Sequence, residues 1–233
     1  MEILSIGSDA KTVKGEKFGV FTGICYLAPA DESGYNVCPN SSAGCRAACL
    51  FTAGRGACTN VKTWRINKTL SFFKNRSAWM TQLQEEIEAL VRKGIKLGKK
   101  IAIRLNGTSD LPWERIKCKN GLSLIENHPS VQFYDYTKSP ERMIAYIKGQ
   151  MPKNYHLTFS KSEENQADVE LIAKMGGNIA VVFRNDLPKK YLGKKVVDGD
   201  LSDLRFMDPK GVVVGLSEKG RAKKDTSGFV VDI

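Results

Sequence analysis

The chain has 233 residues, of which 42% are hydrophobic and 9% aromatic, so it can bury a domain-sized core. This composition excludes a wholly disordered chain, a collagen-like repeat and a short disulfide scaffold. The 36 Lys and Arg against 25 Asp and Glu give a formal charge of +11, which indicates an anionic partner or, alternatively, a lysine-coated surface. No apolar run approaches the roughly 20 residues of a transmembrane helix, and residues 1–10 lack the pattern of an export signal. We therefore expect a cytoplasmic protein with no membrane partner.

The N-terminal part of the chain, residues 1–36, is predicted to be irregular or β, with a strand or hairpin at residues 18–27. A cysteine-rich stretch follows. Residues 60–73 and 78–96 then show apolar residues at helical spacing, and Ser77 is the expected N-cap of the second helix.

Five of the six cysteines lie within 34 residues, between Cys25 and Cys58. Thiols of a protein without an export signal stay reduced, so this clustering indicates metal binding or reactive sulfur rather than disulfides. The tightest group is Cys38, Cys45 and Cys49, in a turn-rich loop that leads into a helical turn. Its C-x6-C-x3-C spacing fits three irons of a 4Fe–4S cluster and leaves the fourth iron open. Zinc is an alternative that needs Cys25 or Cys58 as a fourth ligand, and buried cysteines without a ligand role are another.

From residue 100 onward, short apolar segments alternate with helical ones. This alternation predicts parallel β/α units, which wind into an open sheet or curl into a barrel. The predicted strands are residues 100–105, 131–136, 155–159, 178–183, 194–197 and 211–216. The predicted helices are residues 113–116, 122–127, 140–148 and 166–175.

Polar side chains follow the carboxyl ends of these strands, where parallel β/α folds place their active sites. The aspartates at positions 198, 200 and 203 fit either a magnesium site or an aspartate-capped turn. The other strand-end polar residues are Arg104, Asn106, Ser109, Asp110, Asp135, Thr137, Lys138, Ser160, Glu163, Arg184 and Asn185.

Three motifs carry a resemblance to a known group of proteins. The first is the cysteine loop, with Cys38-Pro39, Gly44-Cys45 and Cys49; the second is the segment 103–110, and the third is the segment 133–138. Together they resemble uncharacterised bacteriophage iron–sulfur proteins with a radical-SAM-like three-cysteine loop, over residues 36 to about 185. The cysteine spacing differs from the C-x3-C-x2-C of radical S-adenosylmethionine enzymes.

The resemblance implies a single-domain partial (β/α) barrel of about six parallel strands. Residues 1–59 would form the N-terminal segment with the cysteine loop, residues 60–216 the β/α units, and residues 217–233 a C-terminal tail. It also implies that the location is the host cytoplasm.

The same resemblance implies roles for individual residues. Cys38, Cys45 and Cys49 would bind the cluster, and S-adenosylmethionine would bind at the open iron. The expected catalytic residues are Asp135 and Lys138. The expected cofactor-binding residues are Arg104, Asn106, Asp110 and Arg184.

Three function classes remain open from the sequence. One is a cluster-dependent enzyme, radical-SAM-like, that acts on an anionic or nucleic-acid-related substrate. Another is a DNA- or RNA-binding phage protein of replication or regulation, with a structural metal site and basic groups at residues 92–100, 189–195 and 219–224. The third is a metal-stabilised interaction protein without catalysis.

Overall fold

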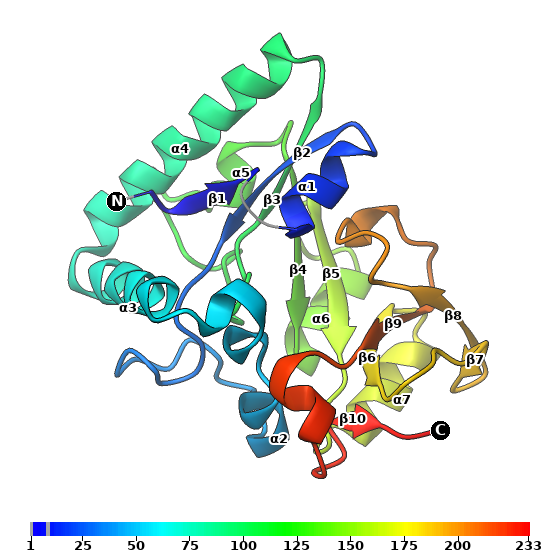
Figure 1. Ribbon diagram of the computed structural model, residues 1–233. Helices are drawn as coiled ribbons and strands as arrows, with labels where there is room; N and C mark the ends of the chain where they lie inside the picture. Colours follow the sequence, from blue (N-terminus) through cyan, green and yellow to red (C-terminus); the bar gives the residue numbers. More distant parts are fainter. Residues whose placement is uncertain (1, 8–9) are drawn as a thin grey trace.

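The computed structural model describes residues 2–7 and 10–233, which form an α/β fold around a ten-stranded sheet (Figure 1). The strand order is β1-β2-β3-β4-β5-β6-β9-β8-β7, with β10 paired to β6. Neighbours from β2 to β8 along this order are parallel, whereas β1 and β7 pair antiparallel at the two edges.

The elements have the following bounds. The strands are β1 (Leu4–Ile6), β2 (Val20–Cys25), β3 (Lys100–Arg104), β4 (Gln132–Thr137), β5 (Tyr155–Ser160), β6 (Ile179–Phe183), β7 (Lys190–Tyr191), β8 (Lys194–Asp198), β9 (Val213–Ser217) and β10 (Val230–Val231). The helices are α1 (Ala10–Glu16), α2 (Ala43–Ala47), α3 (Thr59–Lys74), α4 (Arg76–Lys96), α5 (Leu124–Asn127), α6 (Pro140–Ile147) and α7 (Gln166–Lys174). The short 3-10 helices are η1 (Leu50–Thr52), η2 (Gly54–Ala57), η3 (Arg205–Met207) and η4 (Gly220–Lys224).

The two faces of the sheet are covered differently. One face packs against helices, and its buried cluster joins Leu83 and Ile87 of α4 to Phe133 of β4. The other face carries Tyr134, which alternates with Phe133 along the strand, and is covered by Leu204 from the segment 199–208. Both faces of the parallel sheet are therefore covered by other parts of the chain.

The last strand, β10, lies where two strands diverge. β9 pairs along the whole of β6, so β10 must occupy the opposite edge of β6, at Val182 and Phe183. β5 pairs with that edge only at Ile179 and Ala180. The C-terminal segment thus fills the gap at the carboxyl end of β5, next to α2 (Figure 1).

The α/β class and the mostly parallel sheet of the sequence prediction are confirmed, and the partial barrel stays a prediction. The run from β2 to β8 has seven parallel strands rather than about six. The stretch predicted to be irregular or β contains the helix α1, so that prediction was wrong for residues 10–16. Residues 1, 8 and 9 lie outside the described residues.

Two local predictions also differ from the structure. Helix α4 begins one residue before Ser77, and its N-cap is Asn75, whose side chain accepts from the Ala78 N–H at 3.3 Å. Asn is as good a cap as Ser, so the sequence pattern could not separate them. The helix predicted at residues 113–116 is wrong, because residues 113–115 form a turn. No helix in the described part of the chain is long and apolar enough to cross a membrane.

Candidate functional site

The connection between β2 and α3 brings Cys38, Cys45 and Cys49 together at the carboxyl end of the sheet. Cys45 and Cys49 both raise the pKa of the Cys38 thiol, so the three sulfurs lie within electrostatic reach of one another. All six cysteines are free thiols. Among the described residues, no three His, Cys, Asp or Glu side chains are arranged around one metal ion. The thiolates of an iron–sulfur cluster bind different irons, so they lie farther apart than the ligands of a single ion.

Cys38 is held between two loops that follow neighbouring strands. Its sulfur accepts the N–H of Ala30 at 3.3 Å and lies 3.6 Å from the carbonyl oxygen of Thr108. Burial raises the pKa of this thiol to about 12. Without a bound metal the thiol is protonated at neutral pH, so metal binding has to displace a proton.

Cys45 lies in the short helix α2, whose start is clamped by a carboxylate. The N-cap Ser42 accepts from the Cys45 N–H at 3.2 Å and donates to Glu163 Oε2 at 2.8 Å. The Gly44 N–H donates to Glu163 Oε1 at 2.6 Å. A Cβ on Gly44 would lie 2.7 Å from the same oxygen and would also collide with Ser227, so glycine is required by close approach. The loop is thereby fixed to the end of β5 and to the C-terminal segment.

The spacing of four residues at the start of a helical turn predicts that Cys45 and Cys49 share a helix face. That prediction is wrong, because Cys49 lies two residues beyond α2 with an extended backbone. Burial raises the pKa of its thiol, while the N–H of Phe51 and the charges of Lys138 and Arg65 lower it. The ammonium of Lys138 donates to Ser160 Oγ at 3.0 Å. Two cations therefore flank the thiol group, and they favour thiolate.

Asp110 joins the cysteine loop to the rest of the site. Its N–H donates to the Val37 carbonyl at 2.8 Å, and its carboxylate accepts from the Lys138 N–H at 2.8 Å and from Arg142 at 2.7 Å. Arg142 is buried and makes a second, bidentate pair with Glu114 at 2.8 and 2.9 Å. Both oxygens of Asp110 are thus used to position the loop.

Asn106 and Asp135 lie beneath this loop and support it. The side-chain oxygen of Asn106 accepts from Ser109, Leu111 and Trp113, at 2.8 to 3.0 Å. Asp135 accepts the Asn106 N–H at 2.6 Å and the Tyr155 hydroxyl at 2.9 Å. Its burial is complete, and this raises its pKa to about 7.

Arg104 and Arg184 have partners away from the cysteine loop. Arg104 lies on the opposite face of the sheet, where it binds both oxygens of Asp203 at 3.0 and 2.9 Å. Arg184 pairs with Asp232 and donates to the Asp225 carbonyl at 2.6 Å. The structure therefore brings together the three predicted cysteines, Asp110 and Lys138, with Asn106 and Asp135 below them.

Sequence reasoning missed two charged residues of the site. Arg142 lies in the first turn of an amphipathic helix, where an arginine is usually exposed, and Arg65 lies in a helix with no clear polar face. The separation of Asp110 and Glu114 by four residues was the available indication that two carboxylates converge on one cation.

The three aspartates at positions 198, 200 and 203 have separate partners. Asp203 binds Arg104, Asp200 pairs with Lys219, and Asp198 accepts the Asp200 N–H at 2.8 Å. This arrangement supports the interpretation as an aspartate-capped turn.

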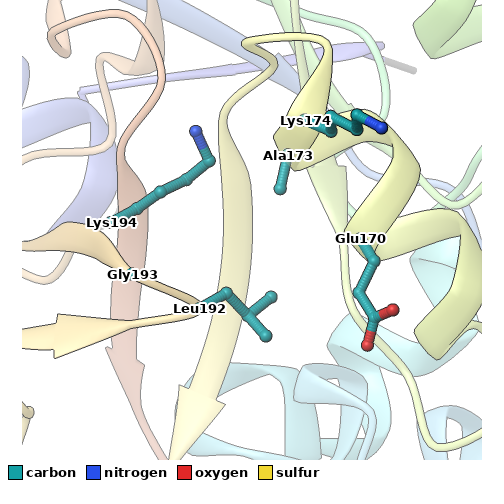
Figure 2. A pocket seen from close by; sticks show the side chains of 6 residues that line it. All are labelled: Glu170, Ala173, Lys174, Leu192, Gly193 and Lys194. Carbon is teal, nitrogen blue, oxygen red and sulfur yellow. The ribbon is translucent and has the colours of Figure 1, made fainter.

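A shallow groove of about 580 Å³ lies at the other edge of the sheet. Figure 2 shows the residues that line it, with Glu170, Ala173 and Lys174 of α7 on one side and Leu192, Gly193 and Lys194 of the β7–β8 hairpin on the other. Leu192 and Gly193 both have positive φ, 50° and 70°, as a tight hairpin turn requires. The groove carries charges of both signs, so it has no clear preference for an anion.

A family model described as Gene product 88 matches residues 4–233. Comparisons with curated proteins and with solved structures give no match. The phage part of the resemblance inferred from the sequence is thereby confirmed at the level of the family. The chain belongs to the Gene product 88 family, a family of phage gene products.

Proposed function

We propose that this protein is a cluster-dependent phage enzyme in which Cys38, Cys45 and Cys49 bind a 4Fe–4S cluster. The observation that supports this is the convergence of three free thiols with two cations, Lys138 and Arg65, near one of them. The positive charges offset the negative charge that three thiolates bring into a partly buried site. A cluster with three protein ligands supplies an iron with an open position, at which a small molecule such as S-adenosylmethionine binds.

The protein residues around the cysteines bind and orient. Lys138 binds a carboxylate or phosphate of the cofactor or substrate, because its ammonium donates to the neutral Ser160 and acts electrostatically on Cys49 of the cysteine site. Asp110 and Asn106 hold the loops that carry Cys38 and Thr108. Asp135 acts as a positioning residue, since it is fully buried and bonded to the Asn106 backbone. The substrate is anionic or related to nucleic acid.

Anaerobic purification, followed by an absorption spectrum and iron and sulfide analysis, tests the proposal. We expect a brown protein with close to four irons and four sulfides per chain, as a four-iron cluster requires. Cys45→Ala should abolish iron binding, because two thiolates hold a cluster poorly. The matched control is Cys58→Ala, at an exposed cysteine outside the group of three, which should keep the cluster.

The outcome that contradicts the cluster is stoichiometric zinc with no iron after anaerobic reconstitution. Cofactor binding is measured separately, as a change in the electron-spin resonance of the reduced cluster when S-adenosylmethionine is added. An unchanged spectrum at saturating S-adenosylmethionine would mean that the protein holds a cluster but does not bind this cofactor there. That result would refute this part of the proposal.

A further inference from the structure

Residues 33–84 contain no Asp or Glu, although acidic residues make up 25 of the 233 in the chain. This segment includes the cysteine loop, the whole of α3 and the start of α4. An uninterrupted acid-free stretch of this length concentrates positive charge on one part of the fold. Its cations are Arg46, Arg55, Lys62, Arg65, Lys68, Lys74 and Arg76, of which Lys68 is buried and adds nothing to the surface.

An exposed tryptophan lies in the middle of this basic segment. Trp64 is 54% exposed, whereas the other two tryptophans, Trp79 and Trp113, are buried in the core. Trp64 shares one exposed stripe of α3 with Asn67, and this stripe continues to Lys74. A tryptophan in water among amides and cations offers a flat stacking surface.

A second aromatic surface lies near the end of α3. Tyr35 is 39% exposed and stacks on Phe73, with ring centroids 4.2 Å apart and planes inclined by 5°. The guanidinium of Arg76 lies 5.7 Å from the Phe73 ring. Trp64 and Phe73 are nine positions apart, which is about 14 Å along the axis of α3 and about half a turn around it, so the two aromatic surfaces lie on different sides of the helix.

The basic surface continues into a groove of about 500 Å³ at the start of α4. None of the residues that line this groove is acidic, in contrast to the groove of Figure 2, which contains Glu170. The lining also supplies hydroxyl and amide groups that donate hydrogen bonds to phosphate oxygens. The residues that line it are Arg76, Ser77, Met80, Thr81, Gln84, Lys117, Cys118, Lys119 and Asn120.

We propose that the exposed face of α3 from Trp64 to Lys74, together with this groove, binds single-stranded nucleic acid. Cations along a track neutralise the phosphates, and exposed aromatic rings stack on unpaired bases, which a duplex does not offer. The partner is a single strand because a flexible chain can pass from Trp64 over Lys74 to the Tyr35–Phe73 pair, which lies next to Arg76 at the groove, and stack a base on each ring surface. This inference is independent of the proposed cluster and holds whether or not the cysteines bind iron.

The test is fluorescence anisotropy of a labelled oligothymidylate of 20 nucleotides, with the full-length protein at 50 and 200 mM salt. Trp64→Ala should weaken binding about tenfold, which is near the lower end of the loss expected for one stacked base. Lys74→Glu/Arg76→Glu should make the slope of log binding constant against log salt concentration less steep by about 1.4. Each phosphate contact to a single strand contributes about 0.7 to that slope. Trp64→Phe should retain most of the affinity.

Wild-type protein gives a measurement that needs no variant. Because the other tryptophans are buried, quenching of tryptophan emission by unlabelled oligonucleotide should report on Trp64. The charge-matched control is Lys153→Glu/Lys210→Glu, at two exposed lysines outside the basic segment, which should bind like the wild type.

Three results would overturn the inference. One is no binding of the wild type at 50 mM salt, and another is stronger binding of a duplex of the same length. The third is unchanged affinity of both the Trp64→Ala and the Lys74→Glu/Arg76→Glu proteins. A variant of the β7–β8 hairpin, Lys194→Glu/Lys195→Glu, is measured beside them, and it alone could then lose binding. That last pattern would assign the surface to the β7–β8 hairpin.

Discussion

Replacing Asp203 by Asn removes one charge from the buried ion pair that joins β3 to the segment 199–208. Arg104 is 5% exposed and Asp203 is 9% exposed, and two N···O distances of 3.0 and 2.9 Å join them. The Arg104 Nε atom is buried without a hydrogen-bond acceptor, so the carboxylate is the main compensation for the guanidinium charge. Loss of one partner from such a pair costs about 3–5 kcal/mol. At roughly 2–4 °C per kcal/mol, the variant should melt roughly 6–20 °C below the wild type.

The double variant Arg104→Met/Asp203→Leu shows whether the two side chains stabilise the fold as an ion pair or independently of each other. It removes both charges and fills the space with apolar atoms, so most of the lost stability should return. Urea unfolding of the wild type, Arg104→Met, Asp203→Leu and the double variant, followed by circular dichroism, gives the coupling energy between the two residues. A double variant that is as unstable as the sum of the singles would refute the reasoning. If Arg104 instead bound a cofactor, Asp203→Asn would leave the unfolding free energy nearly unchanged and would weaken cofactor binding.

Three further predictions concern the cysteine site and its support. Burial raises the Asp135 pKa to about 7, against about 3.9 in an unfolded chain, so the folded state holds this proton from pH 4 to 7. Wild-type stability should therefore fall relative to Asp135→Asn as pH rises through that window; a pH-independent difference in urea unfolding contradicts this. Glu163→Gln keeps only one acceptor for the two donors at the start of α2, so amide exchange at Gly44 and Cys45 should accelerate, and unchanged rates would show that the clamp is unimportant. Gly44→Ala should cost about 1–3 kcal/mol in thermal unfolding, because its Cβ would lie 2.7 Å from a Glu163 oxygen; wild-type stability would mean that the loop can move away.

The regular part of the fold was predictable because its pattern is local. The helix predicted at residues 140–148 is observed at Pro140–Ile147, and the strand predicted at residues 155–159 is Tyr155–Ser160. The spacing of apolar residues along the chain predicts the elements, however, and not the order of the strands in the sheet. β9 lies between β6 and β8, although β8 precedes it in the chain, and only long-range pairing decides this.

The candidate site was predictable where the residue type itself limits its role. The close spacing of three cysteines predicted that they share one site, and the structure brings them together. The role of a charged residue is harder to predict from sequence, because an arginine in a helix is expected to be exposed unless its partners are known. Arg142 is buried only because Asp110 and Glu114, from the preceding connection, both bind it. Arg104 lies at the carboxyl end of a strand, as a binding residue of a parallel sheet does, but its partner Asp203 lies 99 residues away in the chain.

The position of β10 has a consequence for the order of events during synthesis. Phe229 and Val230 pack against Cys45 and Ala48, so residues near the end of the chain form part of the support for the cysteine loop. A ribosome adds about 5–20 residues per second, and the β2-to-β6 core can fold while the last segment is still being made. The cysteines are then the first part of the site to emerge and the last to be enclosed. Any metal delivered to them before residues 229 and 230 are made meets an open loop, and one delivered later meets a closed loop.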